Sequence, residues 1–62
     1  MRLYVVFDGP SAVGTEASLV SAYASARWLA TEQPGRKLSV ERDGEVVVTC
    51  EVSNGKMKAW VR

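Results

Sequence analysis

The clearest hydrophobic pattern in the chain is helical and spans residues 18–35. At about 100° per residue, its apolar positions gather on one face, which holds Leu19, Ala22, Tyr23, Ala26, Leu29 and Ala30. Ser18 suits the N-cap, because its hydroxyl can accept a hydrogen bond from a backbone N–H of the first turn. Pro34 and Gly35 end the run. We expect a helix whose alanine-rich face lies close against a sheet.

Trp28 falls on the opposite side of this helix. Its expected neighbours are small or polar, namely Ser21, Ala24, Ser25 and Glu32. An indole over small residues would form a flat apolar platform facing solvent. Trp28, Ala24 and Ser21 are therefore predicted to contact a partner. The alternative is that the indole covers the edge of a loop, or that the helix is rotated and buries it.

Residues 2–7 are β-branched and aromatic, which predicts a strand. We place Leu3, Val5 and Phe7 on its core face, and the other face then holds Tyr4 and Val6. Asp8-Gly9-Pro10 predicts a turn. Residues 11–17 fit either a loop or a short strand that pairs back on the first. We favour this hairpin, with Gly14 marking a weak or bulged edge.

Three strand-like runs follow the helix, over residues 37–41, 45–52 and 56–61. Asn54-Gly55 predicts a two-residue loop between the last two. In that register one face of the hairpin is apolar. It holds the pairs Val48–Val61, Cys50–Ala59 and Val52–Met57. The other face then pairs Thr49 with Trp60 and Glu51 with Lys58, both favourable cross-strand combinations.

Asp43-Gly44, between the first two of these runs, raises a question of register. A two-residue loop would put Leu38 and Val40 on the face opposite Val46 and Val48. A three-residue loop, with Gly44 in the left-handed conformation, sets Val40 against Val46 and Leu38 against Val48. Because a one-residue slip exchanges the two faces, the apolar pattern favours the three-residue loop.

Together these elements predict one α+β domain over residues 1–62, in which one α-helix packs on one face of a four- or five-stranded antiparallel sheet. The order is strand, optional strand, helix and three strands. The expected core comprises Leu3, Val5, Phe7, Leu38, Val40, Val46, Val48, Cys50, Val52, Met57, Ala59 and Val61. The open face would hold a second partner-binding surface, made of Tyr4, Val47, Trp60 and Lys58. The alternative is that the Lys58 and Arg62 stems shelter the outer aromatics.

Net charge, hydrophobic run length and cysteine count limit the classes of protein to which this chain can belong. A net charge of +1 gives no electrostatic footprint for nucleic acid or a membrane. The apolar run at residues 3–7 is too short for a signal-peptide core or a membrane span. The single Cys50 excludes an intramolecular disulfide and fits a reducing compartment, so we predict a cytoplasmic protein.

The chain carries no catalytic constellation that we can identify. It has no histidine, and the acidic residues Glu41, Asp43 and Glu45 flank a turn without a second cluster to complete a metal site. The glycines after the first strand match neither phosphate-binding pattern. Cys50, on a core face without a nearby base, is expected to be structural. We expect no enzymatic activity, no cofactor and no bound metal.

The layout from Glu16 to Trp60 resembles certain very small phage-encoded anti-CRISPR proteins. The shared features are the Ser18-Leu19 helix start, the Ala-Arg-x-x-Ala helix centre (Ala26, Arg27, Ala30), the Asp43-Gly44 and Asn54-Gly55 hairpins and the late Trp60. This resemblance implies inhibition by occupying a surface of a CRISPR effector complex. The chain also resembles the small sheet-plus-helix domain of HicB-type antitoxins, which likewise places a hairpin before its helix.

We therefore expect a small non-enzymatic protein-binding module, a phage or mobile-element inhibitor that blocks a host defence complex in the host cytoplasm. One alternative is a nucleic-acid-binding module that uses the open sheet face. The other is a HicB-like antitoxin homodimer.

Overall fold

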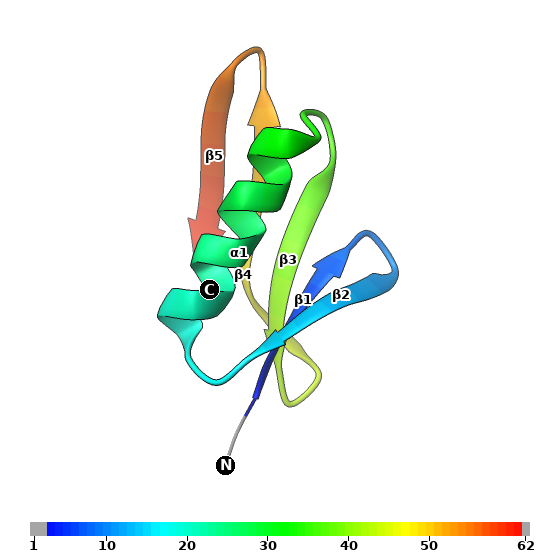
Figure 1. Cartoon of the computed structure of the whole chain (residues 1–62), viewed down its shortest axis with the longest axis vertical. Coiled ribbons are helices and arrows are strands. Elements are labelled where there is room, and N and C mark those ends of the chain that lie inside the picture. The colour runs from blue at the N-terminus through cyan, green and yellow to red at the C-terminus, as the bar shows by residue number, and fades with distance from the viewer. Residues whose placement is uncertain (1–2, 62) are drawn as a thin grey trace.

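The structure is a computed structural model that describes residues 3–61. Its elements are β1 (Tyr4–Asp8), β2 (Ser11–Glu16), α1 (Leu19–Glu32), β3 (Lys37–Arg42), β4 (Glu45–Ser53) and β5 (Lys56–Val61). The strands form a five-stranded antiparallel sheet in the order β2-β1-β3-β4-β5, and α1 crosses one face of it (Figure 1). The predicted α+β fold is confirmed, with the favoured early hairpin present as β1 and β2. The expected strand start at Arg2 and the sheltering role of Arg62 lie outside the described residues.

α1 has the cap that the sequence predicts and most of the predicted packing face. The exception is Leu19, which was placed on that face but is exposed in the first turn of the helix, where it lines an open hollow. The Ser18 hydroxyl accepts a hydrogen bond from the Ser21 backbone N–H at 3.2 Å. Ala22, Ala26 and Ala30 are fully buried against the sheet. Alanine has no side chain beyond Cβ, so the helix backbone can lie close to the strands. This close approach lets a chain of 62 residues form a core.

The β4–β5 hairpin has the predicted register throughout. Asn54 and Gly55 form a two-residue loop with φ values of 54° and 74°, as a type I′ turn requires. Val48 pairs with Val61 and Thr49 with Trp60, and the intervening pairs follow in order.

The predicted three-residue loop between β3 and β4 is wrong. Arg42 pairs with Glu45 across a two-residue Asp43-Gly44 turn, whose φ values are 54° and 81°. The extra residue that the apolar pattern demands is instead a β-bulge at Val47, since Glu41 pairs with Val46 and Val40 with Val48. Val46 therefore lies opposite Glu41 and outside the core cluster, contrary to its predicted place in the core.

The two faces of β1 are the reverse of those predicted. Val6 is fully buried and Tyr4 packs against the core, whereas Val5 and Phe7 belong to the other face. Pairing with β3 decides this, because Val6 lies opposite the buried Val40 and Phe7 lies opposite Ser39. Leu3, also predicted in the core, is exposed.

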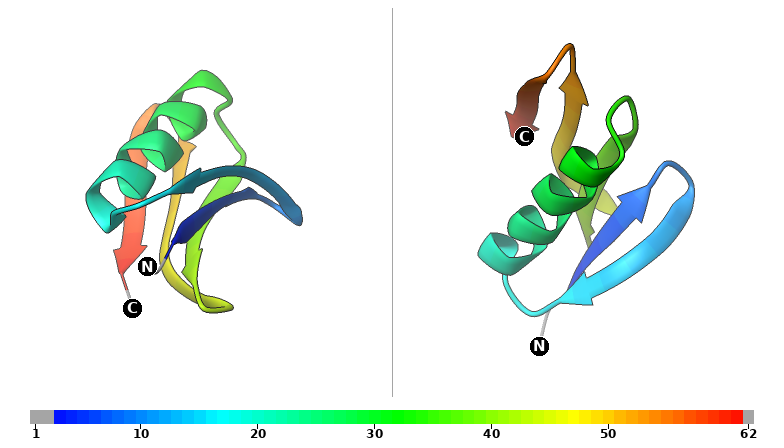
Figure 2. Two further views of the ribbon diagram at one scale, coloured as in Figure 1. Left: turned by 60° about the horizontal axis from the view of Figure 1, so that its bottom comes forward. Right: turned by 45° about the horizontal axis from the view of Figure 1, so that its top comes forward.

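The core is confined to the part of the sheet that the helix covers. Its buried members are Val6, Ala22, Ala26, Ala30, Leu38, Val40, Val48 and Cys50. α1 packs on β1, β2, β3 and β4, and it leaves the C-terminal residues of β5 exposed. Ala59 and Val61, both predicted in the core, are exposed, Val61 to 75%. In the part of the chain that the structure describes, the opposite face of the sheet carries no helix (Figure 2).

Within residues 3–61 no helix combines the length and apolarity that crossing a bilayer demands. The same residues contain no group of three or more His, Cys, Asp or Glu side chains placed to hold a metal ion.

Candidate partner-binding groove

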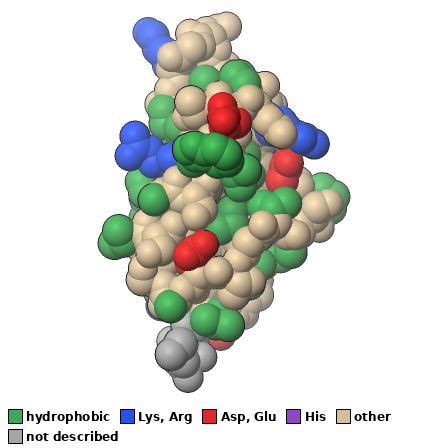
Figure 3. All heavy atoms as spheres, in the orientation of Figure 1, with side chains coloured by type: hydrophobic (Ala, Val, Ile, Leu, Met, Phe, Trp, Pro, Cys, Tyr) green, Lys and Arg blue, Asp and Glu red, His purple; other side chains and the backbone are tan. Residues whose placement is uncertain are grey.

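A groove runs between α1 and the edge strand β2. It encloses a hollow of about 430 Å³. We call it the α1–β2 groove, and its lining residues are Val6, Val13, Gly14, Glu16, Ala24, Ser25, Trp28 and Leu29. Figure 3 views this side of the molecule, where hydrophobic side chains gather near the centre. Most of the lining is apolar, so a partner that fills the groove would remove hydrophobic surface from water.

The sequence of β2 creates the hollow. Gly14 lies opposite Val6, and because glycine has no side chain, the space above this pair is left unfilled. The register shifts between the pairs made by Val6 and Phe7, which leaves Val13 as a bulged residue. Val13 is 49% exposed and lines the groove. The prediction of a weak or bulged edge near Gly14 is thus confirmed.

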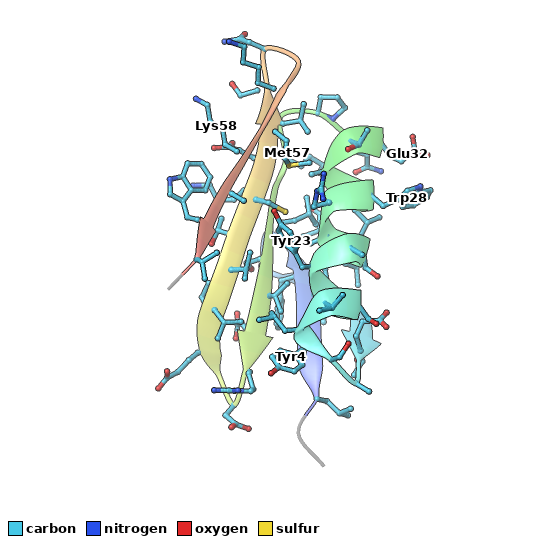
Figure 4. All side chains as sticks on the ribbon, turned by 90° about the vertical axis from the view of Figure 1, so that its left-hand side faces the viewer. Tyr4, Tyr23, Trp28, Glu32, Met57 and Lys58 are labelled. Atoms are coloured by element: carbon cyan, nitrogen blue, oxygen red, sulfur yellow. The ribbon has the colours of Figure 1, made fainter. Side chains whose placement is uncertain are left out.

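Trp28 is the most prominent apolar side chain of the groove. It is 63% exposed, and in Figure 4 it projects from α1 away from the sheet on the same side as Glu32. The predicted neighbour Ala24 shares the groove with it. Ser21 does not line the hollow, and its hydroxyl accepts a hydrogen bond from the Ser18 hydroxyl at 3.1 Å. The alternative in which the helix buries Trp28 is wrong.

Within residues 3–61, the only charged residue that lines the groove is an acid. Glu16 is half-buried, and its Oε2 accepts a hydrogen bond from the Ser25 hydroxyl at 3.4 Å. Among the described residues, neither Glu16 nor Glu32 has an ion-pair partner. Arg27 lies over the ring of Tyr23, 5.6 Å from its centroid, on the other flank of the helix. The α1–β2 groove is therefore apolar with unneutralised negative charge beside it.

The second predicted surface does not form as a unit. Trp60 and Lys58 do lie on the uncovered sheet face, opposite Thr49 and Glu51. Tyr4 instead packs against the core on the helix side, where its hydroxyl accepts a hydrogen bond from Arg42 Nη1 at 3.3 Å.

Val47, placed on the open face by prediction, also packs against the core, because the bulge sets it beside Val48 opposite Val40. In place of this surface, one row of paired residues crosses the uncovered face. Its members, in order across the strands, are Phe7, Ser39, Thr49 and Trp60. Sequence reasoning missed Phe7 because it placed that residue in the core.

A second hollow, of about 270 Å³, lies on the other flank of α1. It is lined by Leu19, Val20, Tyr23, Val48 and Val61. Val20 is 80% exposed here. This hollow exists because α1 does not extend over β5. The sequence signal that could have indicated it is Val20, an apolar residue that lies outside the predicted apolar face of the helix.

Cys50 is buried in the core, as predicted. Burial raises the pKa of its thiol above the ordinary value of 9.0, and the positive charge of Arg27 offsets part of that rise. A thiol that is buried and resists ionisation fits a structural role.

Comparison with protein-family models, with curated proteins and with solved structures finds no match for this chain. The surfaces described above are therefore the basis for inferring function. The anti-CRISPR and HicB resemblances stay predictions drawn from layout.

Proposed function

We propose that this chain is a small protein-binding module that contacts a larger protein through the α1–β2 groove. The observation that carries the proposal is Trp28, a largely exposed indole beside an apolar hollow. Tryptophan is enriched among the residues that dominate binding energy at protein interfaces, and such residues sit beside pockets that exclude water. A partner side chain that fills the hollow would also cover the indole and so bury it from water.

We extend the proposal to inhibition. A chain that covers a working surface of a larger complex blocks that surface by occupying it, and this needs no chemistry of its own. In the anti-CRISPR-like form of the proposal, the partner is a host defence complex in the host cytoplasm. The motivation is the layout resemblance, together with a surface suited to protein contact.

The test compares two tryptophan substitutions. Trp28→Ala removes the indole of the groove, and Trp60→Ala, on the uncovered sheet face, is the matched control. Each protein is immobilised, proteins are captured from a host lysate, and the captured partner is purified and titrated by calorimetry. We expect Trp28→Ala to weaken binding at least about tenfold, as for an interface hot spot, and Trp60→Ala to leave it within about threefold.

Circular dichroism first establishes that both variants keep the fold. If the folded Trp28→Ala protein binds the partner as tightly as the unaltered protein does, the α1–β2 groove is not the contact surface.

The uncovered sheet face supports a second candidate, single-stranded nucleic-acid binding. Phe7 and Trp60 belong to one row there, and bases can stack on exposed aromatic rings. Lys37 and Lys58 lie on either side of Glu51, which offsets part of their charge. With a net charge of +1, the chain gains little phosphate attraction.

This candidate is tested by titrating oligo-dT and oligo-U at low salt while following tryptophan fluorescence. Salt-dependent quenching that Trp60→Ala removes would support it, and unchanged fluorescence at low salt excludes it.

A further inference from the structure

We infer that the partner enters the α1–β2 groove as an extended peptide segment, which adds one more strand along the free edge of β2 and carries a Lys or Arg next to an apolar side chain. This inference rests on the proposed function and specifies the chemistry of the partner. It combines three features of the groove: an open strand edge, an adjoining hollow and uncompensated negative charge.

The first feature is the edge itself. β2 is the end strand of the sheet, so one side of its backbone has no partner strand within the described residues. The other end strand, β5, carries Lys56 and Lys58, and lysines on an edge strand oppose the addition of a further strand. β2 has no Lys, Arg or Pro between Ser11 and Glu16, and its protection consists of the bulge at Val13 and the single charge of Glu16 at its end. β2 is therefore the less protected edge.

The second feature is the hollow beside that edge. Side chains of an added strand would point alternately toward the helix side and away from it. One helix-side chain would stand next to the space left above Gly14, with Trp28 and Val13 beside it. A hollow of about 430 Å³ has room for an aliphatic side chain. Backbone hydrogen bonds would then supply affinity, while the hollow selects an apolar residue.

The third feature is charge. Glu16 lines the groove and Glu32 lies one helical turn from Trp28, and neither has a cationic partner among the described residues. The helix cation Arg27 lies over Tyr23 on the opposite flank. Arg36 is already paired with Asp8, at 3.2 Å. A Lys or Arg of the peptide would therefore meet a field of opposite sign, which favours its approach and fixes its register.

A second copy of β2 would not supply this chemistry. Two β2 strands paired edge to edge bring no cation to Glu16, since residues 11–16 contain none. A peptide from a different protein is the occupant that fits the charge.

The experiment selects peptides on the intact folded chain. A phage-displayed library of random heptapeptides is panned against the unaltered protein, Glu16→Lys and Glu45→Lys. Glu45→Lys makes the same charge change at the exposed β3–β4 hairpin, away from the groove, and so serves as the matched control. We expect the unaltered protein and Glu45→Lys to enrich Lys or Arg next to Val, Ile or Leu. Glu16→Lys should lose that basic preference.

The most enriched peptide is then synthesised and titrated. We expect at least about tenfold weaker binding to Glu16→Lys and about unchanged binding to Glu45→Lys. Amide resonances of residues 11–16 should shift, and the outward-facing amides among them should gain protection from hydrogen exchange. Glu32→Lys, at an exposed helix position, repeats the charge test in case Glu16→Lys does not fold.

The inference would be overturned by selected peptides without basic residues, by amide shifts that spare β2, or by no enrichment at all. Concentration-dependent self-association that Glu16→Lys abolishes would also overturn it, because the occupant would then be a second copy. If Trp28→Ala still weakens partner binding at least about tenfold in any of these cases, the proposed function stands without the strand-addition mode. If Trp28→Ala has no effect on the partner, the proposed function itself fails.

Discussion

Gly14 lies directly opposite Val6 at the edge of the sheet, and the missing side chain leaves the α1–β2 groove open above this pair. A Cβ at Gly14 would meet the Val6 Cβ at 4.0 Å, which is ordinary van der Waals contact. The backbone there does not have the positive φ that only glycine adopts readily. The position can therefore hold a larger residue without strain, and its glycine is a feature of the groove rather than a requirement of the fold.

Replacing Gly14 with valine should separate binding from stability. The added side chain fills the space above Val6, so we expect partner binding to weaken at least about tenfold. Stability should rise by about 0.5–1 kcal/mol, because a glycine within a strand loses more backbone entropy on folding. Calorimetry with the captured partner and urea unfolding measure the two effects. Gly14→Ala, which fills less of the space, should fall between, and a Gly14→Val protein with unchanged affinity would show that the hollow is not used.

The sequence predicted those parts of the fold in which local signals agreed. In the β4–β5 hairpin, the Asn54-Gly55 turn and the alternation on both strands select one register, and the structure has it. The helix face followed from its alanine spacing, and the exposed position of Trp28 followed from the same periodicity.

The errors arose where the local pattern permits two solutions. β1 has apolar residues on both faces, so alternation could not choose between Val6 and Phe7, and the choice depended on pairing with β3. In the β3–β4 hairpin the pattern required one extra residue but could not say where, and the bulge at Val47 supplied it. The groove escaped prediction for the same reason, because it depends on where the Val13 bulge places β2.

Enlarging the buried face of α1 should destabilise the domain. Ala26 is fully buried between the helix and the sheet, so Ala26→Leu forces the two apart and should cost about 1–3 kcal/mol. Ala24→Leu makes the same change at an exposed position of the helix and should alter stability by less than about 0.5 kcal/mol. Urea unfolding at one temperature compares them. Equal effects of the two substitutions would contradict the close helix–sheet contact.

Cys50 should make stability fall in alkaline solution. Its pKa is raised in the folded protein, mainly by burial, so the unfolded chain loses the thiol proton first as the pH rises. The un-ionised thiol contributes to the free energy of unfolding. This contribution is complete below the ordinary thiol pKa of 9.0 and is lost as the pH rises through the pKa of the thiol in the folded protein. Thermal unfolding between about pH 7 and about pH 10 measures this fall.

Cys50→Ala provides the control for that measurement. The variant lacks the thiol, so its melting temperature should decline less steeply over the same pH range, whatever its starting stability. Parallel declines in the two proteins would assign the alkaline effect to other groups. In the native protein at neutral pH, the buried thiol should also react slowly with a thiol reagent, and denaturant should accelerate the reaction.

Deleting Val47 should leave a folded protein, although it removes a residue from the middle of the sheet. Without the bulge, the two-residue Asp43-Gly44 turn leads directly into regular pairing that keeps Val40 opposite Val48. The loss of one half-buried side chain should cost about 1–3 kcal/mol.

Deleting Ser39 from the partner strand is the matched control, because it would turn the buried Leu38 to the uncovered face while Val40 stays in place. We expect that variant to unfold. Amide spectra distinguish the two outcomes, and a folded Ser39 deletion beside an unfolded Val47 deletion would contradict the bulge as the element that sets the register.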